Sequence, residues 1–190
     1  MARPLQWYGM ALAFFHVSEL ALEWLHNRQE FDFFGSLLIS KPYVLAHGVG
    51  LLEFGVESWL LPSMKAHEGI MWMGVFFVVL GESIRKAGII VGKHNFTHQI
   101  RRSNADKRNV LVKHGIYKWV RHPGYLGWFI WAPATQVVLM NPLCTIAFTV
   151  VAQRFFRERI PYEEQYLRQF FPQEYEDYAR QTSSWIPGIA

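Results

Sequence analysis

A run of 32 residues, from His122 to Gln153, contains no Asp, Glu, Lys or Arg. A helix that crosses the hydrocarbon core of a bilayer needs about 20 apolar residues, so this run is too long for one crossing and suits two short ones. Asn141-Pro142 lies inside the run, and Pro cannot continue a helix. The run therefore predicts a tight helical hairpin that enters a membrane after Arg121 and leaves it near Arg154.

Three further apolar blocks precede the hairpin and cover residues 5–25, 42–61 and 70–92. With the hairpin they predict an all-α integral membrane protein with about five transmembrane segments. We expect one domain, 1–190, in which 1–92 supplies three membrane helices and 93–190 supplies a polar loop, the hairpin and a C-terminal helix. The connections at 26–41 and 62–69 are predicted to be loops.

The apolar blocks also contain charged side chains, namely Glu19, Glu53, Glu57, Arg85 and Lys86. Charged groups inside membrane helices normally face the bundle interior and pair with one another. We therefore expect these residues to be structural partners, with contact to a ligand as the alternative.

The segment 93–121 is strongly basic, with Asp106 as its one acidic residue against Lys93, Arg101, Arg102, Lys107, Arg108, Lys113, Lys118 and Arg121. Because basic loops stay in the cytosol, we expect this segment there, with the hairpin turn and the N-terminus on the opposite side. A further helix is expected to begin at Pro161, to run to about Thr182 and to be broken at Pro172.

Several function classes lack their motifs. The single cysteine, Cys144, excludes an internal disulfide and a cysteine-rich metal site. The sequence has no GxGxxG, GxxxxGK[ST], CxxC or HExxH motif. His94 and His98 have the i, i+4 spacing of a metal pair, but no suitably placed carboxylate or cysteine completes the site. We expect neither a metal nor nucleic-acid binding.

A series of motifs follows in a recognisable order: Phe14-Phe15-His16-Val17-Ser18-Glu19, Gly81-Glu82, Phe96-Thr97-His98, Leu111-Val112-Lys113-His114-Gly115-Ile116-Tyr117, Arg121-His122-Pro123-Gly124-Tyr125, Asn141-Pro142, Arg154-Phe155-Phe156 and Arg159-Ile160-Pro161-Tyr162-Glu163-Glu164. In this order the chain resembles the isoprenylcysteine carboxyl methyltransferases, in their short five-helix form. The resemblance covers nearly the whole chain and is densest from residue 94 onward.

The resemblance implies methyl esterification, with S-adenosyl-L-methionine as cofactor, of the C-terminal prenylcysteine carboxylate of CaaX-processed proteins such as small GTPases. It implies a multi-pass protein of the endoplasmic reticulum membrane, in contact with membrane lipids, whose cofactor-binding loop and active site face the cytosol. By the same resemblance the cofactor site comprises Arg101, Asn109, Val110, Leu111, Val112, Tyr117, His122, Pro123, Gly124, Tyr125 and Glu163. Arg159 holds the substrate carboxylate.

The chemistry of the residues agrees with this reaction. An α-carboxylate has a pKa of roughly 3.5, so it is ionised at neutral pH and needs alignment with the methyl group rather than a general base. An arginine such as Arg159 offers a planar fork of donors for a carboxylate. Glu163 follows at i+4 on the same helix face. Tyr117, Trp119 and Tyr125 can attract a sulfonium through cation–π contact.

A lipid substrate also needs an apolar groove, and we expect it between the third and fourth membrane segments. Trp128 and Trp131, together with Phe129, are its candidate lining residues, and Arg154 is a further candidate substrate contact. Aromatic side chains that simply face lipid are the competing interpretation.

Three other functions stay open from the sequence. A sterol reductase-like membrane enzyme that uses NADPH carries a similar Arg-His-Pro segment. A phospholipid N-methyltransferase uses the same cofactor with an amine acceptor. A non-catalytic carrier of prenyl tails has the lipid groove but does not need the cofactor-binding residues. The site residues also have structural interpretations: Arg159 and Glu163 can be a plain i, i+4 ion pair, and His122-Pro123 can merely cap the hairpin.

Overall fold

A computed structural model describes residues 2–28, 31–103 and 109–189, and Asp106, Lys107 and Arg108 of the basic segment lie outside it. The described chain is all-α apart from an isolated bridge between Val120 and Ser183. Its α-helices are α1 (Ala2–His26), α2 (Phe33–Ser36), α3 (Lys41–Leu60), α4 (Glu68–Gly92), α5 (Pro123–Val138), α6 (Pro142–Phe170) and α7 (Pro172–Gln181). Short 3₁₀ turns lie at Met64–Ala66, Lys93–Asn95 and Gly115–Lys118. The predicted all-α class is confirmed.

The helical hairpin is formed by α5 and α6, and the chain reverses over Leu139, Met140 and Asn141. Met140 adopts a left-handed φ of 55°. Asn141 is the residue before α6, and its Nδ2 donates to the carbonyl of Gly50 at 2.7 Å. The turn is therefore fastened to α3 as well as to its own two helices.

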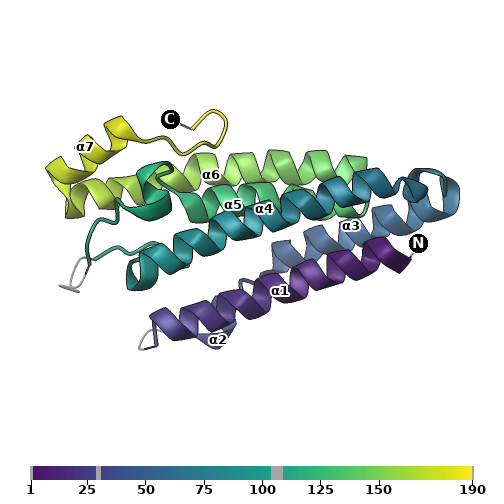
Figure 1. Cartoon of the computed structure of the whole chain (residues 1–190), viewed down its shortest axis with the longest axis horizontal. Helices are drawn as coiled ribbons and strands as arrows, with labels where there is room; N and C mark the ends of the chain where they lie inside the picture. Colours follow the sequence, from purple (N-terminus) through teal and green to yellow (C-terminus); the bar gives the residue numbers. More distant parts are fainter. Residues whose placement is uncertain (1, 29–30, 104–108, 190) are drawn as a thin grey trace.

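The long helices run along the long axis of the molecule (Figure 1). The helix α4 packs against α5 and contacts α1, and α3 contacts α6. The segment that follows α4, the end of α6 and α7 gather at one end. The N-terminus and the hairpin turn lie at the other end (Figure 1). Lys65 joins the hairpin turn to α3 at that end, because its Nζ donates to the carbonyl of Leu139 at 2.9 Å and to Glu57 at 2.6 Å. The basic segment thus lies at one end, and the N-terminus and the hairpin turn lie at the other, as the charge pattern predicts.

Among the charged residues of the apolar blocks, Glu19 pairs with Arg85 and Lys86, as expected. Glu57 instead pairs with Lys65, and Glu53 bonds backbone N–H groups. Arg85 of α4 donates to Glu19 of α1 at 2.7 and 2.8 Å, and both side chains are buried. Lys86 also contacts Glu19, and it lies 3.1 Å from Glu82. Glu53 accepts from the backbone N–H groups of Leu143 and Cys144 at the start of α6. These contacts give each of these helices a polar attachment to a neighbour.

Two details differ from the prediction. A new helix does not begin at Pro161; instead α6 continues through it. The residues on both sides are held by tertiary contacts, with Phe156 and Ile160 buried before Pro161 and Glu164 buried after it. These contacts hold the helix together across a residue that cannot donate its own hydrogen bond. The second difference is α2, a single helical turn capped by Asp32 within the predicted loop. The predicted break at Pro172 is confirmed.

The sequence also predicts that about five of the helical segments cross a membrane. Over residues 2–28, 31–103 and 109–189, no helix meets the combined length and hydropathy expected of a membrane span.

The helices α4 and α5 pack closely against each other. At Gly127 an added Cβ would lie 2.5 Å from the carbonyl oxygen of Gly81 and 2.6 Å from the backbone N of Arg85. These are backbone atoms, so they cannot move aside as a flexible side chain would. The pair Gly81 and Gly127 therefore sets the distance between the two helices that carry the polar centre of the molecule.

Gly127→Ala is expected to lower stability by about 1–3 kcal/mol, because overpacking forces the two backbones apart. Thermal unfolding in detergent measures the effect. Gly55→Ala on α3 is the matched control, since nothing lies within 4 Å of its added Cβ. There the better helix former should raise stability by roughly 0.5–1 kcal/mol. Equal effects at the two glycines would contradict the close contact.

Candidate active site

The segment from Tyr117 to Tyr125 leads into α5 and is held by the C-terminal part of the chain. Its backbone pairs with the tail, because the N–H of Arg121 donates to the carbonyl of Ser183 at 3.1 Å. The hydroxyl of Tyr178 on α7 donates to the carbonyl of Tyr117 at 2.8 Å. Pro123 occupies the first turn of α5, where its missing N–H is not needed. The tail therefore fixes the position of the Arg-His-Pro motif.

A buried charged cluster holds the side chains of this motif against α6. Arg121 Nε donates to Glu164 Oε1 at 3.1 Å, and His122 Nε2 lies 3.1 Å from the same oxygen. Arg121 also donates to the carbonyls of Ala179 and Thr182. Arg168 of α6 lies 3.3 Å from the other oxygen of Glu164. The Glu164 carboxylate thus connects Arg121 and His122 to α6, and Arg121 in turn contacts α7.

Glu164 gives the cluster a defined pH dependence. Burial disfavours its ionised form, but the hydrogen bond from His122 and the charges of His122 and Arg121 outweigh burial and lower its pKa from 4.5 to about 2. A carboxylate with a lowered pKa stabilises the fold above its unfolded pKa, roughly 4.3 for Glu. That contribution is lost as the pH falls toward the folded value.

Glu164→Gln is therefore expected to be less stable than the parent protein at pH 7, and the gap should shrink as the pH falls from about 4.5 toward 2. Thermal unfolding in detergent over this range measures both. Glu158→Gln serves as the control, because Glu158 pairs with Arg154 at an exposed position within the described part of the chain. Its replacement should change stability little at any pH. A gap that stays constant with pH would show that Glu164 does not carry the effect.

A cavity of about 110 Å³ lies next to the cluster, between the α4–α5 connection, α6 and α7. Nine of the eleven residues predicted for the cofactor line it: Val110, Leu111, Val112, Tyr117, His122, Pro123, Gly124, Tyr125 and Glu163. Glu163 Oε2 is buried and has no hydrogen-bond partner among the described residues. Its nearest basic atom is Nδ1 of His122, at 3.7 Å. The cavity therefore presents an unused acceptor beside aromatic walls.

The other two predicted cofactor residues lie outside the cavity wall. Arg101 donates to the side chain of Asn109 and, at 2.8 Å, to the carbonyl of His94. Next to Asn109, the N–H of Val110 donates to Asn95 at 2.9 Å. Arg101 and Asn109 thus join the two ends of the loop that brings Val110, Leu111 and Val112 to the cavity.

Sequence reasoning missed part of the cavity wall. Phe96, Arg121, Leu167, Tyr175 and Tyr178 also line it. Tyr175 and Tyr178 are three residues apart on one face of α7, and both are buried. The sequence shows that both tyrosines share one helix face, but it does not show what that face contacts. Only the docking of α7 against residues 117–121 gives them a place at the site.

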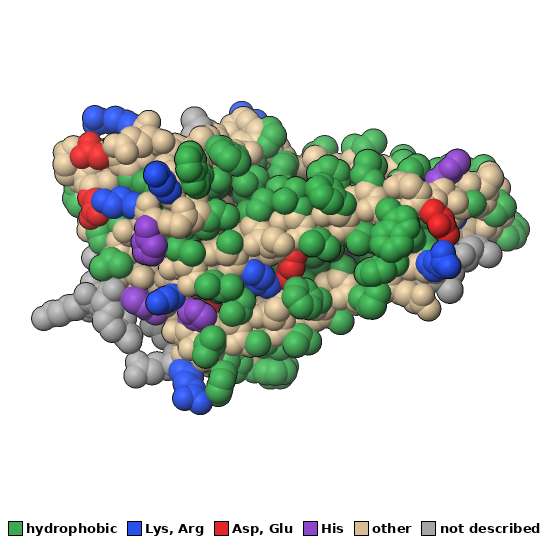
Figure 2. Space-filling view, in the orientation of Figure 1, with side chains coloured by type: hydrophobic (Ala, Val, Ile, Leu, Met, Phe, Trp, Pro, Cys, Tyr) green, Lys and Arg blue, Asp and Glu red, His purple; other side chains and the backbone are tan. Residues whose placement is uncertain are grey.

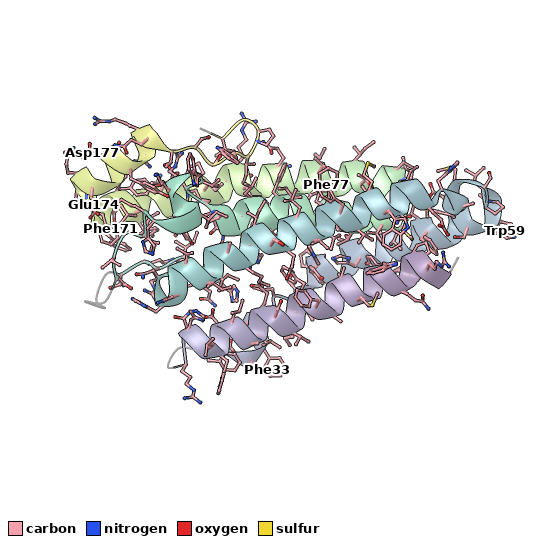
Figure 3. All side chains as sticks on the ribbon, in the orientation of Figure 1. Phe33, Trp59, Phe77, Phe171, Glu174 and Asp177 are labelled. Carbon is pink, nitrogen blue, oxygen red and sulfur yellow. The ribbon has the colours of Figure 1, made fainter. Side chains whose placement is uncertain are left out.

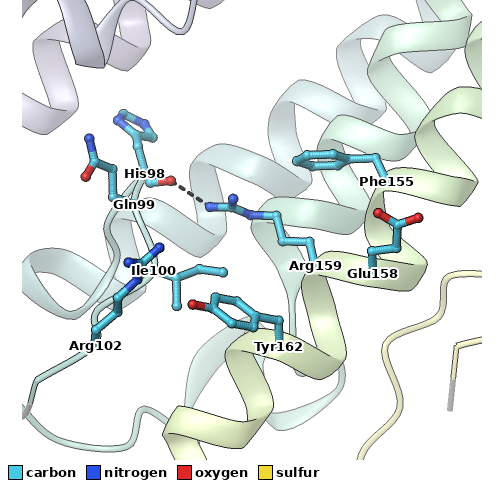
Figure 4. Close-up of a pocket in the computed structure, with 8 residues that line it drawn as sticks. All are labelled: His98, Gln99, Ile100, Arg102, Phe155, Glu158, Arg159 and Tyr162. Carbon is cyan, nitrogen blue, oxygen red and sulfur yellow. Dashed lines mark hydrogen bonds between the residues drawn. The ribbon is translucent and has the colours of Figure 1, made fainter.

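Arg159 lies in a larger adjoining cavity of about 710 Å³, formed by the loop after α4 and by α6. Its lining residues are His98, Gln99, Ile100, Arg102, Phe155, Glu158, Arg159 and Tyr162 (Figure 4). Arg159 Nη2 donates to the carbonyl of His98 at 2.8 Å, and Nε donates to the hydroxyl of Tyr125 at 2.9 Å. Tyr125 therefore lies in the wall of one cavity and holds the arginine of the other.

The remaining candidate substrate residues do not meet in one groove. The Arg154 side chain is 85% exposed and lies 3.6 Å from Glu158, at the margin of the Arg159 cavity. Trp128 packs against Phe155 and Phe156 of α6. Trp131 is buried and stacks on Phe15 of α1 at 4.3 Å. Their roles in substrate binding stay predictions.

Comparison with known proteins gives consistent similarities. The sequence model of the isoprenylcysteine carboxyl methyltransferase (ICMT) family matches residues 73–169. The chain is 46% identical over 189 residues to a probable protein-S-isoprenylcysteine O-methyltransferase of Oryza sativa subsp. indica, covering 99% of this chain and 98% of the relative. It is 43% identical to protein-S-isoprenylcysteine O-methyltransferase A of Arabidopsis thaliana, covering 98% and 94%.

A solved structure is also similar. It is described as that of the eukaryotic intramembrane Ras methyltransferase ICMT, and it matches with a TM-score of 0.92 at 37% sequence identity. The match covers 96% of this chain and 65% of the solved chain.

Proposed function

The chain belongs to the isoprenylcysteine carboxyl methyltransferase family and is therefore an enzyme that methylates prenylcysteine; from this premise we propose that S-adenosyl-L-methionine is its methyl donor. The donor binds in the cavity beside Glu163, and Arg159 holds the carboxylate that receives the methyl group. Family membership sets aside the reductase, the phospholipid methyltransferase and the carrier as alternatives.

The residues of the smaller cavity fit this cofactor. The unpartnered Oε2 of Glu163 can accept a hydrogen bond from a ribose hydroxyl or an adenine amine. The rings of Tyr117, Tyr125 and Tyr175 line the same cavity and favour a cation such as a sulfonium. When bound, the cofactor supplies an electrophilic methyl group on sulfur. Ligand sites usually enclose about 300–1,000 Å³, so we expect side chains of the wall to move apart when the cofactor binds.

Arg159 is the residue that we propose binds the substrate carboxylate. The hydrogen bonds that orient its guanidinium group are the main support for this role. Nε and Nη2 are used to fix the guanidinium plane. Nη1 has no hydrogen bond within the described part of the chain and is available to a carboxylate in the 710 Å³ cavity. Arg159 and Glu163 are one helical turn apart on α6, so the carboxylate and the cofactor are brought to neighbouring cavities. The substrate carboxylate is already ionised, so alignment with the methyl group is enough and no general base is needed.

We propose that the enzyme acts in the endoplasmic reticulum membrane, with its active-site end in the cytosol, on prenylated CaaX-type proteins such as small GTPases. Large apolar side chains are exposed on α1, α3, α4 and α6, among them Phe14, Trp59, Phe77 and Val151. Trp59 and Phe77 are labelled in Figure 3. On the face in Figure 2, hydrophobic side chains cover most of the middle and charged side chains gather toward the ends. The basic segment lies at the active-site end, in keeping with a cytosolic position.

Calorimetric titration of the detergent-solubilised protein tests the assignment of the cofactor. S-Adenosyl-L-methionine should bind saturably with one site per chain, and NADPH should not bind. Binding of NADPH, or no binding of S-adenosyl-L-methionine to folded protein, would overturn the proposal.

A further inference from the structure

A third cavity, of about 430 Å³, lies between α1 and α4. Most of its lining is hydrophobic, with Trp7, Met10, Ala11 and Phe14 from α1 and Val75, Val78 and Val79 from α4. Ser83 and Lys86 of α4 also line it. Its volume lies within the range of about 300–1,000 Å³ that is usual for small-molecule sites. Neither Arg159 nor Glu163 lines it, so it is separate from the two cavities of the active site.

The inner end of this α1–α4 groove is polar. Glu82 and Trp131 both line it, and both are buried, with residue exposures of 6% and 1%. Glu82 Oε1 accepts from Ser18 at 3.2 Å and lies 3.1 Å from Lys86. In contrast, Oε2 of Glu82 and Nε1 of Trp131 have no hydrogen-bond partner within residues 2–28, 31–103 and 109–189. Figure 2 shows a basic and an acidic side chain side by side within the hydrophobic middle of the molecule.

These two unpartnered atoms have opposite hydrogen-bonding character. The carboxylate oxygen of Glu82 accepts, and the indole N–H of Trp131 can only donate. A buried polar group without a partner is destabilising, so a ligand that supplies both partners gains from both. A hydroxyl group donates one hydrogen bond and accepts others. It can therefore serve as a partner for either kind of atom.

We propose that the α1–α4 groove binds a membrane lipid whose polar head is a free hydroxyl. The hydrocarbon tail lies along the side chains of α1 and α4, and the hydroxyl donates to Glu82 and accepts from Trp131. The prenyl tail of the enzyme's substrate fits this site less well, because it carries no group that donates to Glu82. This inference does not depend on the proposed cofactor or on catalysis.

The test uses hexadecanol with a diazirine in its chain as a photoreactive probe, on the full protein in nanodiscs of phosphatidylcholine. Peptide mass spectrometry should find the label on α1 and α4, and unlabelled hexadecanol should remove it. Hexadecyl methyl ether has the same tail but cannot donate, so it should compete about tenfold more weakly, the loss of roughly one hydrogen bond. Competition by the ether that equals that of the alcohol would overturn recognition of the hydroxyl. Competition by S-farnesylcysteine would make the groove the substrate's own site.

Variants separate the groove from the general lipid-facing surface. Ala11→Phe fills the groove and should abolish the label on both helices. Val150→Phe, on the exposed face of α6, adds the same ring elsewhere and should be labelled like the parent protein. Trp131→Phe keeps the ring and removes the N–H, so hexadecanol should bind about tenfold more weakly. Labelling of Ala11→Phe at the parent level would overturn the proposal.

Discussion

Replacing Arg159 with alanine is expected to reduce kcat/KM for a prenylcysteine substrate by about 10²- to 10³-fold, because a carboxylate in a partly buried site loses its charged partner. Arg159→Lys keeps the charge but loses the planar fork that bonds Tyr125 and the His98 carbonyl. It should recover part of the activity and remain at least tenfold below the parent enzyme. Steady-state methylation of a farnesylcysteine analogue measures both variants.

The matched control is Arg157→Ala, which removes an exposed arginine from the same stretch of α6 and should leave kcat/KM within about twofold. Binding of S-adenosyl-L-methionine should be nearly unchanged in Arg159→Ala, since Arg159 does not line the smaller cavity. A variant that loses cofactor binding together with activity would place Arg159 in the cofactor site instead. Parent-level activity in Arg159→Ala would remove it from the reaction.

Glu163→Gln is expected to weaken S-adenosyl-L-methionine binding by about 10- to 100-fold, because a hydrogen bond to an ionised acceptor contributes roughly 1.5–3 kcal/mol. The effect should appear in the calorimetric Kd and in the KM for the cofactor. The KM for the prenylcysteine substrate should change little, because we propose separate cavities for the two ligands. Asp177→Asn on the exposed face of α7 (Figure 3) is the control and should bind normally. An unchanged Kd in Glu163→Gln would contradict its role.

The helical framework was predictable because its determinants are local. Continuous apolar blocks gave four of the five long helices to within a few residues. The charge-free run with Asn141-Pro142 gave the α5–α6 hairpin, whose turn lies at those residues. The continuity of α6 through Pro161 was not predictable in this way. It depends on contacts of Phe156, Ile160 and Glu164 with residues distant in the sequence.

The site was predictable where the family resemblance fixes a motif, and nine cavity residues were expected on that ground. The role of Glu164 was not, because neighbouring Glu163 and Glu164 look alike in the sequence. Their helical positions turn one toward Arg121 and His122 and the other toward the cavity. The separation of Trp128 from Trp131 likewise depends on which neighbours α5 contacts, and no sequence pattern encodes this.

One measurement tests the central claim, that Glu163 and Arg159 bring a methyl donor and a carboxylate into adjoining cavities. Purified enzyme in liposomes is given methyl-labelled S-adenosyl-L-methionine and either a farnesylcysteine analogue with a free carboxylate or the same analogue as its carboxamide. The account predicts label in a base-labile methyl ester from the acid and none from the amide. Label that is stable to base, or equal label from the amide, would contradict it.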